Sequence, residues 1–113
     1  MLLDDARILA DKLKASEEYR TYCETKARAY AQPSTAALLD ELYALRMKAQ
    51  AASVAGTPDA EVIGKLQKLG ELLQFDEAAA EYLMAEYRLN GLLGEIYKIL
   101  GNAVGLDLGT LEA

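Results

Sequence analysis

The sequence predicts an all-α fold, a helical bundle of about five helices with a long C-terminal helix and a central antiparallel helical hairpin. Ala, Leu, Glu and Lys dominate the chain and no run of β-branched residues appears, which together favour helix over strand. Apolar residues make up 52% of the 113 residues and charged residues 27%, so the chain can bury a core. That length predicts one domain over residues 1–113.

The first helix is expected from about residue 3 to residue 14. Apolar residues recur there at spacings of three and four and so form one face, made of Leu3, Ala6, Ala10 and Leu13. Ser16 then suits the N-cap of a second helix that continues to about residue 31, since Glu17 and Glu18 follow in its first turn. One side of this second helix holds Tyr19, Tyr22 or Cys23, Ala27 and Tyr30. Because Ser16 alone separates the two segments, a single bent helix is the alternative.

The third helix is expected from about residue 34 to residue 55. Pro33 disfavours a helical residue before it and suits the first turn of a new helix. Steps of four and three residues then place the apolar positions on one seam: Leu38, Leu42, Leu45, Ala49 and Ala52.

The connection after the third helix predicts a tight turn. Gly56 suits a left-handed C-cap, Thr57 the N-cap of the next helix, and Pro58 its first position. The fourth helix then extends to about residue 73, and its apolar positions also step by four and three: Val62, Leu66, Leu69 and Leu73. Since the turn is short, residues 34–73 should form the antiparallel hairpin.

The fifth helix is expected to be the longest, from about Glu77 to Val104, with Asp76 as its N-cap and Gly105 at its end. Its apolar stripe consists of Tyr82, Leu89, Leu93, Ile96, Leu100 and Ala103. Nearly opposite the stripe, near Tyr87, lie the glycines Gly91, Gly94 and Gly101. Because each helical glycine costs about 1 kcal/mol relative to Ala, another backbone is expected to approach there, from this chain or from a second one. Residues 106–113 should form a short tail.

The residue counts exclude several kinds of chemistry. The sequence has no His and one Cys, so it lacks the groups for Ser-His-Asp and Cys-His nucleophile systems, His-ligated metals and thiolate clusters. Glu77 and Glu81 lie one helical turn apart, but without His or a calcium loop they are expected to form a solvated acidic face. Cys23 is expected to be a small buried hydrophobe. We therefore expect no catalytic residue, no cofactor and no metal, and predict that the protein is not an enzyme.

Charge is unevenly distributed along the chain. Residues 1–56 hold eight acidic and eight basic residues, whereas residues 57–113 hold ten acidic and four basic ones and carry the whole net charge of −6. Since nucleic-acid binding favours a basic surface, no direct contact with nucleic acid is expected, and the acidic half suits a basic protein surface.

No targeting signal is expected at the start of the sequence, because Asp4 and Asp5 lie where a signal peptide carries basic residues. The most apolar stretch, residues 89–108, is interrupted by charges, so we expect a cytoplasmic protein without membrane contact.

The expected interaction surface lies on the fifth helix. Seven Tyr beside one Phe and no Trp is a skewed aromatic set, and Tyr favours interfaces because it combines an apolar ring with a polar tip. A helix of about 28 residues is longer than one small bundle needs, so its exposed stripe predicts a homodimer or a higher homo-oligomer. The candidate interaction residues are Tyr82, Tyr87, Leu89, Gly91, Leu93, Gly94, Ile96, Tyr97 and Leu100.

Several segments, taken in order, carry a resemblance to a known family. They are residues 6–10 and 16–19, Gln32-Pro33 with the following leucine seam, and the segments from Glu81 to Asn90 and from Leu92 to Ile99. They resemble, respectively, the opening, the second break and the C-terminal helix of the YlbF/YmcA family of small bacterial regulators, which are often labelled control-of-competence regulators. The resemblance extends to about residue 108.

The resemblance implies an all-helical, self-associating protein that pairs with itself or with paralogues and has a cytoplasmic role in competence, biofilm formation and sporulation. For the long members it implies a complex that acts with the endoribonuclease RNase Y in mRNA processing. Those members carry a cysteine-containing C-terminal extension linked to iron–sulfur clusters, and this sequence has no such cysteines. We therefore expect a single YlbF-like helical domain that is a non-enzymatic regulator or adaptor, with a paralogue or a ribonuclease as partner. The alternative is a structural helical oligomer with no regulated partner.

Overall fold

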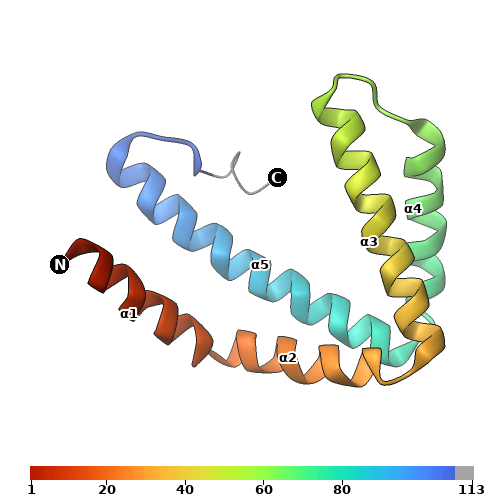
Figure 1. Cartoon of the computed structure of the whole chain (residues 1–113), viewed down its shortest axis with the longest axis horizontal. Helices are drawn as coiled ribbons and strands as arrows, with labels where there is room; N and C mark the ends of the chain where they lie inside the picture. Colours follow the sequence, from red (N-terminus) through yellow and green to blue (C-terminus); the bar gives the residue numbers. More distant parts are fainter. Residues whose placement is uncertain (109–113) are drawn as a thin grey trace.

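The computed structural model describes residues 1–108, which contain five α-helices and no strand (Figure 1). The helices are α1 (Leu2–Lys14), α2 (Glu17–Tyr30), α3 (Pro33–Val54), α4 (Ala60–Leu73) and α5 (Glu77–Val104). The prediction of an all-α fold with about five helices and a long C-terminal helix is therefore confirmed. Residues 109–113 of the expected tail lie outside the described residues.

Local signals in the sequence set most helix boundaries. The Ser16 hydroxyl accepts a hydrogen bond from the Tyr19 amide at 3.1 Å, so α1 and α2 are separate helices rather than one bent helix. At the start of α5 the Asp76 carboxylate accepts from the Ala79 amide at 3.2 Å. Gly105 ends α5 in the left-handed region, at a φ of 72°, which glycine adopts without a Cβ clash.

The start of α4 differs from the expectation. Asp59, not Thr57, is the N-cap, and its carboxylate accepts hydrogen bonds from the amides of Glu61 and Val62 at 3.0 and 3.3 Å. Because Asp caps helices more strongly than Thr, α4 begins two residues later than predicted and Pro58 lies before it.

The helices form two antiparallel pairs that meet at one end and diverge at the other, so the ribbon is V-shaped (Figure 1). Helix α3 packs against α4, and α2 packs against α5. The antiparallel hairpin over residues 34–73 is therefore confirmed. The chain measures 46 × 36 × 16 Å, which makes it thin in one direction.

One cluster of buried side chains fills the point where the two pairs meet, which we call the elbow core. It consists of Ala29, Leu39, Leu42, Leu45, Leu69, Leu73, Ala79 and Tyr82. The expected seams of α3 and α4 lead into it through Leu42, Leu45, Leu69 and Leu73. Leu39 was not expected, and it is fully buried because the N-terminal part of α3 contacts α2 and α5 as well as α4.

Away from the elbow core the chain is open. Helix α1 contacts α2 alone, and none of its Cα atoms comes within 8 Å of one in α5. The radius of gyration is 16.6 Å, against about 13 Å for a compact chain of this length. The accessible surface is 8223 Å², against about 6,100 Å² for a compact monomer of this mass. The helices therefore leave a large surface that the chain itself does not cover.

Two expected faces are not buried as predicted. On α1, the apolar face is present but exposed, and Leu13 alone is half-buried. On α2, Cys23 and Ala27 are exposed, whereas Thr25 and Ala29 are buried. The prediction that Cys23 is a buried hydrophobe is therefore wrong, because α5 packs on the side of α2 that carries Thr25 and Ala29.

Candidate interaction surfaces

A polar cluster joins α3 to α5 beside the elbow core. Tyr82, 1% exposed, is hydrogen-bonded through its hydroxyl to the hydroxyl of Tyr43. Tyr43 in turn donates to Glu86 Oε2 at 2.7 Å, and Arg46 Nη1 donates to Glu86 Oε1 at 2.7 Å. Because Tyr43 has one hydroxyl proton and gives it to Glu86, Tyr82 is the donor in the Tyr–Tyr pair. The cluster thus links the two helix pairs by a continuous chain of hydrogen bonds.

The chemistry of this cluster is structural. Burial raises the pKa of Tyr43 and of Tyr82, and the hydrogen bonds of Tyr43 to Tyr82 and Glu86 raise the pKa of Tyr43 further. Both hydroxyls therefore stay protonated at neutral pH, and neither is activated as a nucleophile or base. Of the expected interaction residues, Tyr82 is enclosed here, where it contributes to packing rather than to an open surface.

Two further contacts join helices, one within the α2/α5 pair and one between the two pairs. Arg28 on α2 and Glu81 on α5 form an ion pair at 3.0 Å. The buried hydroxyl of Thr35, at the start of α3, donates to the Asp76 carboxylate, which also caps α5. The hydrogen bonds from Thr35 and from the Ala79 amide lower the pKa of Asp76. These polar groups are therefore occupied in joining helices.

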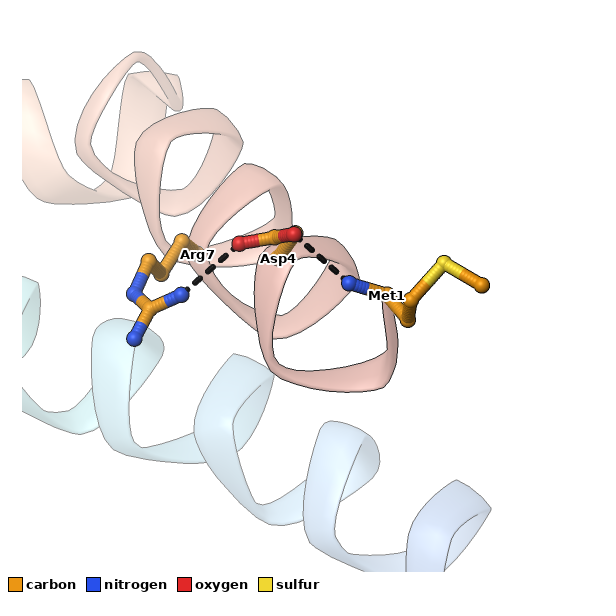
Figure 2. Close-up of polar contacts among 3 residues, drawn as sticks. All are labelled: Met1, Asp4 and Arg7. Carbon is orange, nitrogen blue, oxygen red and sulfur yellow. Dashed lines mark hydrogen bonds and ion pairs between the residues drawn. The ribbon is translucent and has the colours of Figure 1, made fainter.

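Helix α1 is amphipathic but buries no residue within the chain. At 3.6 residues per turn its apolar side chains fall on one side, namely Leu2, Leu3, Ala6, Leu9, Ala10 and Leu13. Its ion pairs lie within the helix: Asp4 accepts from the terminal ammonium of Met1 at 2.6 Å and from Arg7 Nη1 at 2.8 Å (Figure 2). Apart from the half-buried Leu13, the apolar side chains of α1 are therefore exposed in the described chain.

The expected apolar stripe of α5 divides into two parts. Leu89 is buried, Leu93, Ile96 and Tyr97 are half-buried, and Leu100 is 47% exposed. The exposure rises toward the C-terminus of α5 because α2 packs alongside the N-terminal half of α5, whereas α1, which runs beside the C-terminal half, does not contact it (Figure 1). We call α1 together with residues 92–104 of α5 the open arm, since apolar side chains on both segments face solvent there.

The three glycines of α5 have different surroundings. Gly101 is buried, and a Cβ there would collide with the carbonyl oxygen of Leu106, whose amide donates to the Gly101 carbonyl at 2.9 Å. The backbone that approaches Gly101 thus belongs to the same chain. At Gly91 and Gly94 a Cβ would meet nothing within 4 Å, so this part of α5 faces open space.

A second open surface, the elbow groove, lies between the end of α4 and the start of α5. It has a volume of about 580 Å³ and is lined by uncharged residues: Gly70, Leu73, Gln74, Ala80, Leu83, Met84 and Tyr87. Tyr87 is 76% exposed, and Phe75, in the turn between the helices, is 89% exposed. Of the expected interaction residues, Tyr87 therefore belongs to this groove and not to the open arm.

Sequence reasoning placed Tyr87 with the glycines on a second face of the fifth helix but missed the rest of the elbow groove. Ala80, Met84, Tyr87, Gly91 and Gly94 repeat at steps of four and three along α5, a signal that could have extended this face to Ala80 and Met84. Phe75 gave no signal, because a lone aromatic residue in a turn has no periodicity.

Two kinds of feature are absent from the part of the chain that the structure describes. Among residues 1–108, no three His, Cys, Asp or Glu side chains form a group that could hold a metal ion. None of the five described helices combines the length and apolar character that crossing a membrane requires.

Comparison with known proteins identifies the family. Residues 2–105 match the family described as control of competence regulator ComK, YlbF/YmcA. The chain belongs to the YlbF/YmcA family. It is 33% identical to a UPF0342 protein of Symbiobacterium thermophilum over 108 residues, which cover 95% of this chain and 96% of that protein. It is also 33% identical to a UPF0342 protein of Halothermothrix orenii over 112 residues, which cover 98% and 93% of the two chains.

A solved structure has the same fold. The chain is similar to the X-ray crystal structure of Bacillus subtilis RicA in complex with RicF, with a TM-score of 0.61 and 20% sequence identity. The similarity covers 92% of this chain and 93% of that one. The family match and the two relatives confirm the resemblance to the YlbF/YmcA family. The similar structure is that of a complex of two proteins.

Proposed function

We propose that this YlbF/YmcA-family protein is a non-enzymatic regulatory adaptor that acts through helix-mediated contacts with other proteins. The observation that carries the proposal is the open V, in which the open arm and the elbow groove leave apolar side chains uncovered. Exposed apolar patches larger than a few hundred Å² mark interaction sites. The similar RicA structure is a complex with a second protein, which supports the same mode of action here.

The polar groups of the described residues support a binding role over a catalytic one. Tyr43, Tyr82 and Glu86 satisfy one another, and Thr35 and Asp76 join α3 to α5. None of these groups lines the elbow groove. Contact area and shape, rather than a reacting group, are what the open surfaces offer.

Self-association is part of the proposal. On the apolar stripe of α5, Leu93 and Ile96 are half-buried and Leu100 is exposed, and a second copy would cover what the chain itself leaves open. A homodimer is the simplest closed arrangement, because a two-fold axis lets one patch pair with itself.

The proposed cellular role follows the family: a cytoplasmic regulator of competence, biofilm formation or sporulation, with a paralogue or a ribonuclease such as RNase Y as partner. The sequence contains one Cys, Cys23, and this residue is exposed on α2. We therefore propose that the partner is bound through protein surfaces and not through an iron–sulfur cluster.

Co-purification from the native host tests the adaptor role. A tagged wild-type chain should recover a paralogue or a ribonuclease in near-stoichiometric amount, identified by mass spectrometry. Met84→Glu, in the elbow groove, should reduce that recovery at least tenfold, because it places a charge in an uncharged groove. Met47→Glu is the matched control, since Met47 is also an exposed methionine but lies on α3 outside this groove. Recovery of the chain alone would favour a structural oligomer with no regulated partner.

A further inference from the structure

Helix α1 requires a partner that its own chain does not provide. It is 13 residues long and buries no side chain, whereas isolated helices shorter than about 12 to 15 residues are marginal in water. Asp4 and Asp5 in its first turn and Lys12 and Lys14 in its last turn favour the helix, but such end charges add little on an exposed surface. A continuous apolar side on such a helix is therefore expected to be covered in the working protein.

The end of α5 has the same requirement and matching dimensions. Residues 92–104 equal α1 in length, about 20 Å at 1.5 Å per residue. Leu100, Ile99 and Val104 are exposed there. Within one chain the two segments run alongside each other without packing, since no Cα atoms of α1 and α5 lie within 8 Å (Figure 1).

We propose that α1 of one copy packs against residues 92–104 of α5 in a second copy, and reciprocally, so that two open arms form one intermolecular four-helix bundle. The inference rests on the self-association proposed above and names the contact that produces it. A two-fold axis makes such an exchange reciprocal, with both apolar faces buried in each copy.

The surface area available is sufficient. The chain exposes 8223 Å², roughly 2,100 Å² more than a compact monomer of the same mass. A standard stable interface buries about 800 Å² on each partner. The uncovered surface thus exceeds what one such dimer requires.

Charge favours a second copy as the occupant. Helix α1 carries three acidic and three basic residues, and residues 92–104 carry Glu95 and Lys98, so both surfaces are neutral. The net charge of −6 resides elsewhere in residues 57–113. Two open arms can therefore meet without net like-charge repulsion, whereas a strongly basic or acidic partner would find no complementary charge there.

Disulfide trapping between two separately tagged copies tests the contact, both in a Cys23→Ser background. One copy carries Leu9→Cys on the apolar side of α1, and the other carries Leu100→Cys on α5. The matched control replaces the neighbouring Ile8, which lies on the opposite side of α1 and is similarly exposed, at 52% against 41% for Leu9. We expect at least tenfold more mixed disulfide from Leu9→Cys than from Ile8→Cys under mild oxidation.

Association measurements give a second readout. Leu9→Arg should weaken self-association at least tenfold in sedimentation, while Ile8→Arg changes it less than twofold. Both variants should keep the cooperative urea unfolding of the elbow core, because neither side chain belongs to it. A dimer that gives equal trapping from Leu9→Cys and Ile8→Cys would overturn the α1 exchange and leave the proposed self-association standing. A monomeric wild-type protein would overturn both the α1 exchange and the proposed self-association. The adaptor role is tested separately, by the recovery of a different protein in the co-purification experiment.

Discussion

In the elbow core, side chains from four helices converge and bury Leu39, Leu73 and Tyr82 almost completely, whereas in the open arm α1 and the end of α5 leave Leu3 and Leu100 exposed. The two regions have similar helical periodicity, and both carry apolar side chains at spacings of three and four. The difference lies in what is opposite each face. The elbow core is closed by its own chain, and the open arm presents its apolar side to solvent. An amphipathic pattern therefore predicts that a face will be covered, but not by which molecule.

The largest effect is expected in the elbow core. Leu73→Ala removes a fully buried side chain and should lower the free energy of unfolding by about 3 kcal/mol, through lost burial and the cavity left behind. The neighbouring Leu72 is 55% exposed, so Leu72→Ala should change the free energy of unfolding by less than about 0.5 kcal/mol. Urea unfolding of both variants measures the comparison. Equal effects would mean that the elbow core is not closed as described.

The polar cluster should give the next largest effect. Tyr43→Phe removes the hydroxyl between Tyr82 and Glu86 and should cost about 1 to 2 kcal/mol, because both partners lose a hydrogen bond beside the core. Thermal unfolding measures this loss, and the exposed Tyr87→Phe is the control. A loss as small as that of Tyr87→Phe would contradict the linking role of Tyr43.

The same cluster predicts sensitivity to alkaline pH. Burial raises the pKa of Tyr43 and Tyr82 in the folded state above the ordinary tyrosine value, which is about 10. Their contribution to stability is therefore fully present below about pH 10 and is lost as the pH rises further, because the unfolded chain ionises first. Unfolding followed from pH 8 to pH 11 should show a steeper loss in the wild type than in Tyr43→Phe. Parallel profiles would contradict this.

Asp76 should give a smaller effect with the opposite pH dependence. Its pKa is lowered in the folded state by the hydrogen bonds from Thr35 and the Ala79 amide, so its contribution is present above about pH 4 and is lost as the pH falls below that. Asp76→Ala should cost about 1 kcal/mol at neutral pH, as the loss of an N-cap does. The difference from the wild type should shrink at pH 3 in urea titrations, and an unchanged difference there would contradict the assignment.

The smallest effect is expected at the glycines of α5. Gly94→Ala should stabilise the chain by about 0.5 kcal/mol, because a Cβ there meets open space and alanine favours helix. Gly101→Ala should destabilise it, since the Cβ would collide with the Leu106 carbonyl. Changes of opposite sign in the melting temperatures of the two variants would show that α5 is open at Gly94 and closed at Gly101. A destabilised Gly94→Ala would show that a backbone approaches that side as well.

Sequence reasoning identified the helices and most of the elbow core, because periodicity and capping are local. Ser16, Asp76 and Gly105 mark helix ends as expected. Thr57 failed as a cap because the stronger cap Asp59 follows two residues later. The family resemblance was also visible, since it depends on the order of several segments.

The open surfaces were predicted less well, for a physical reason. Burial depends on which elements meet, and that is a long-range property. Leu89 and Leu100 belong to one stripe in the sequence, yet Leu89 is buried and Leu100 is exposed, because α2 packs along only part of the longer α5. Cys23 was placed on the wrong side of α2 because Tyr22 and Cys23 both fit the pattern of spacings. The elbow groove combines residues from α4 and α5, so it could not be predicted without knowing the bend between these two helices.

The mass of the purified protein decides whether a second copy covers the open arm. Multi-angle light scattering at micromolar concentration should give twice the chain mass of 12.3 kDa for the wild type. Leu93→Glu, in the half-buried part of the α5 stripe, should give a folded monomer that still unfolds cooperatively in urea, since the elbow core remains intact. A wild-type mass of 12.3 kDa would contradict the account, because the open arm would then lack the second copy that is proposed to cover it.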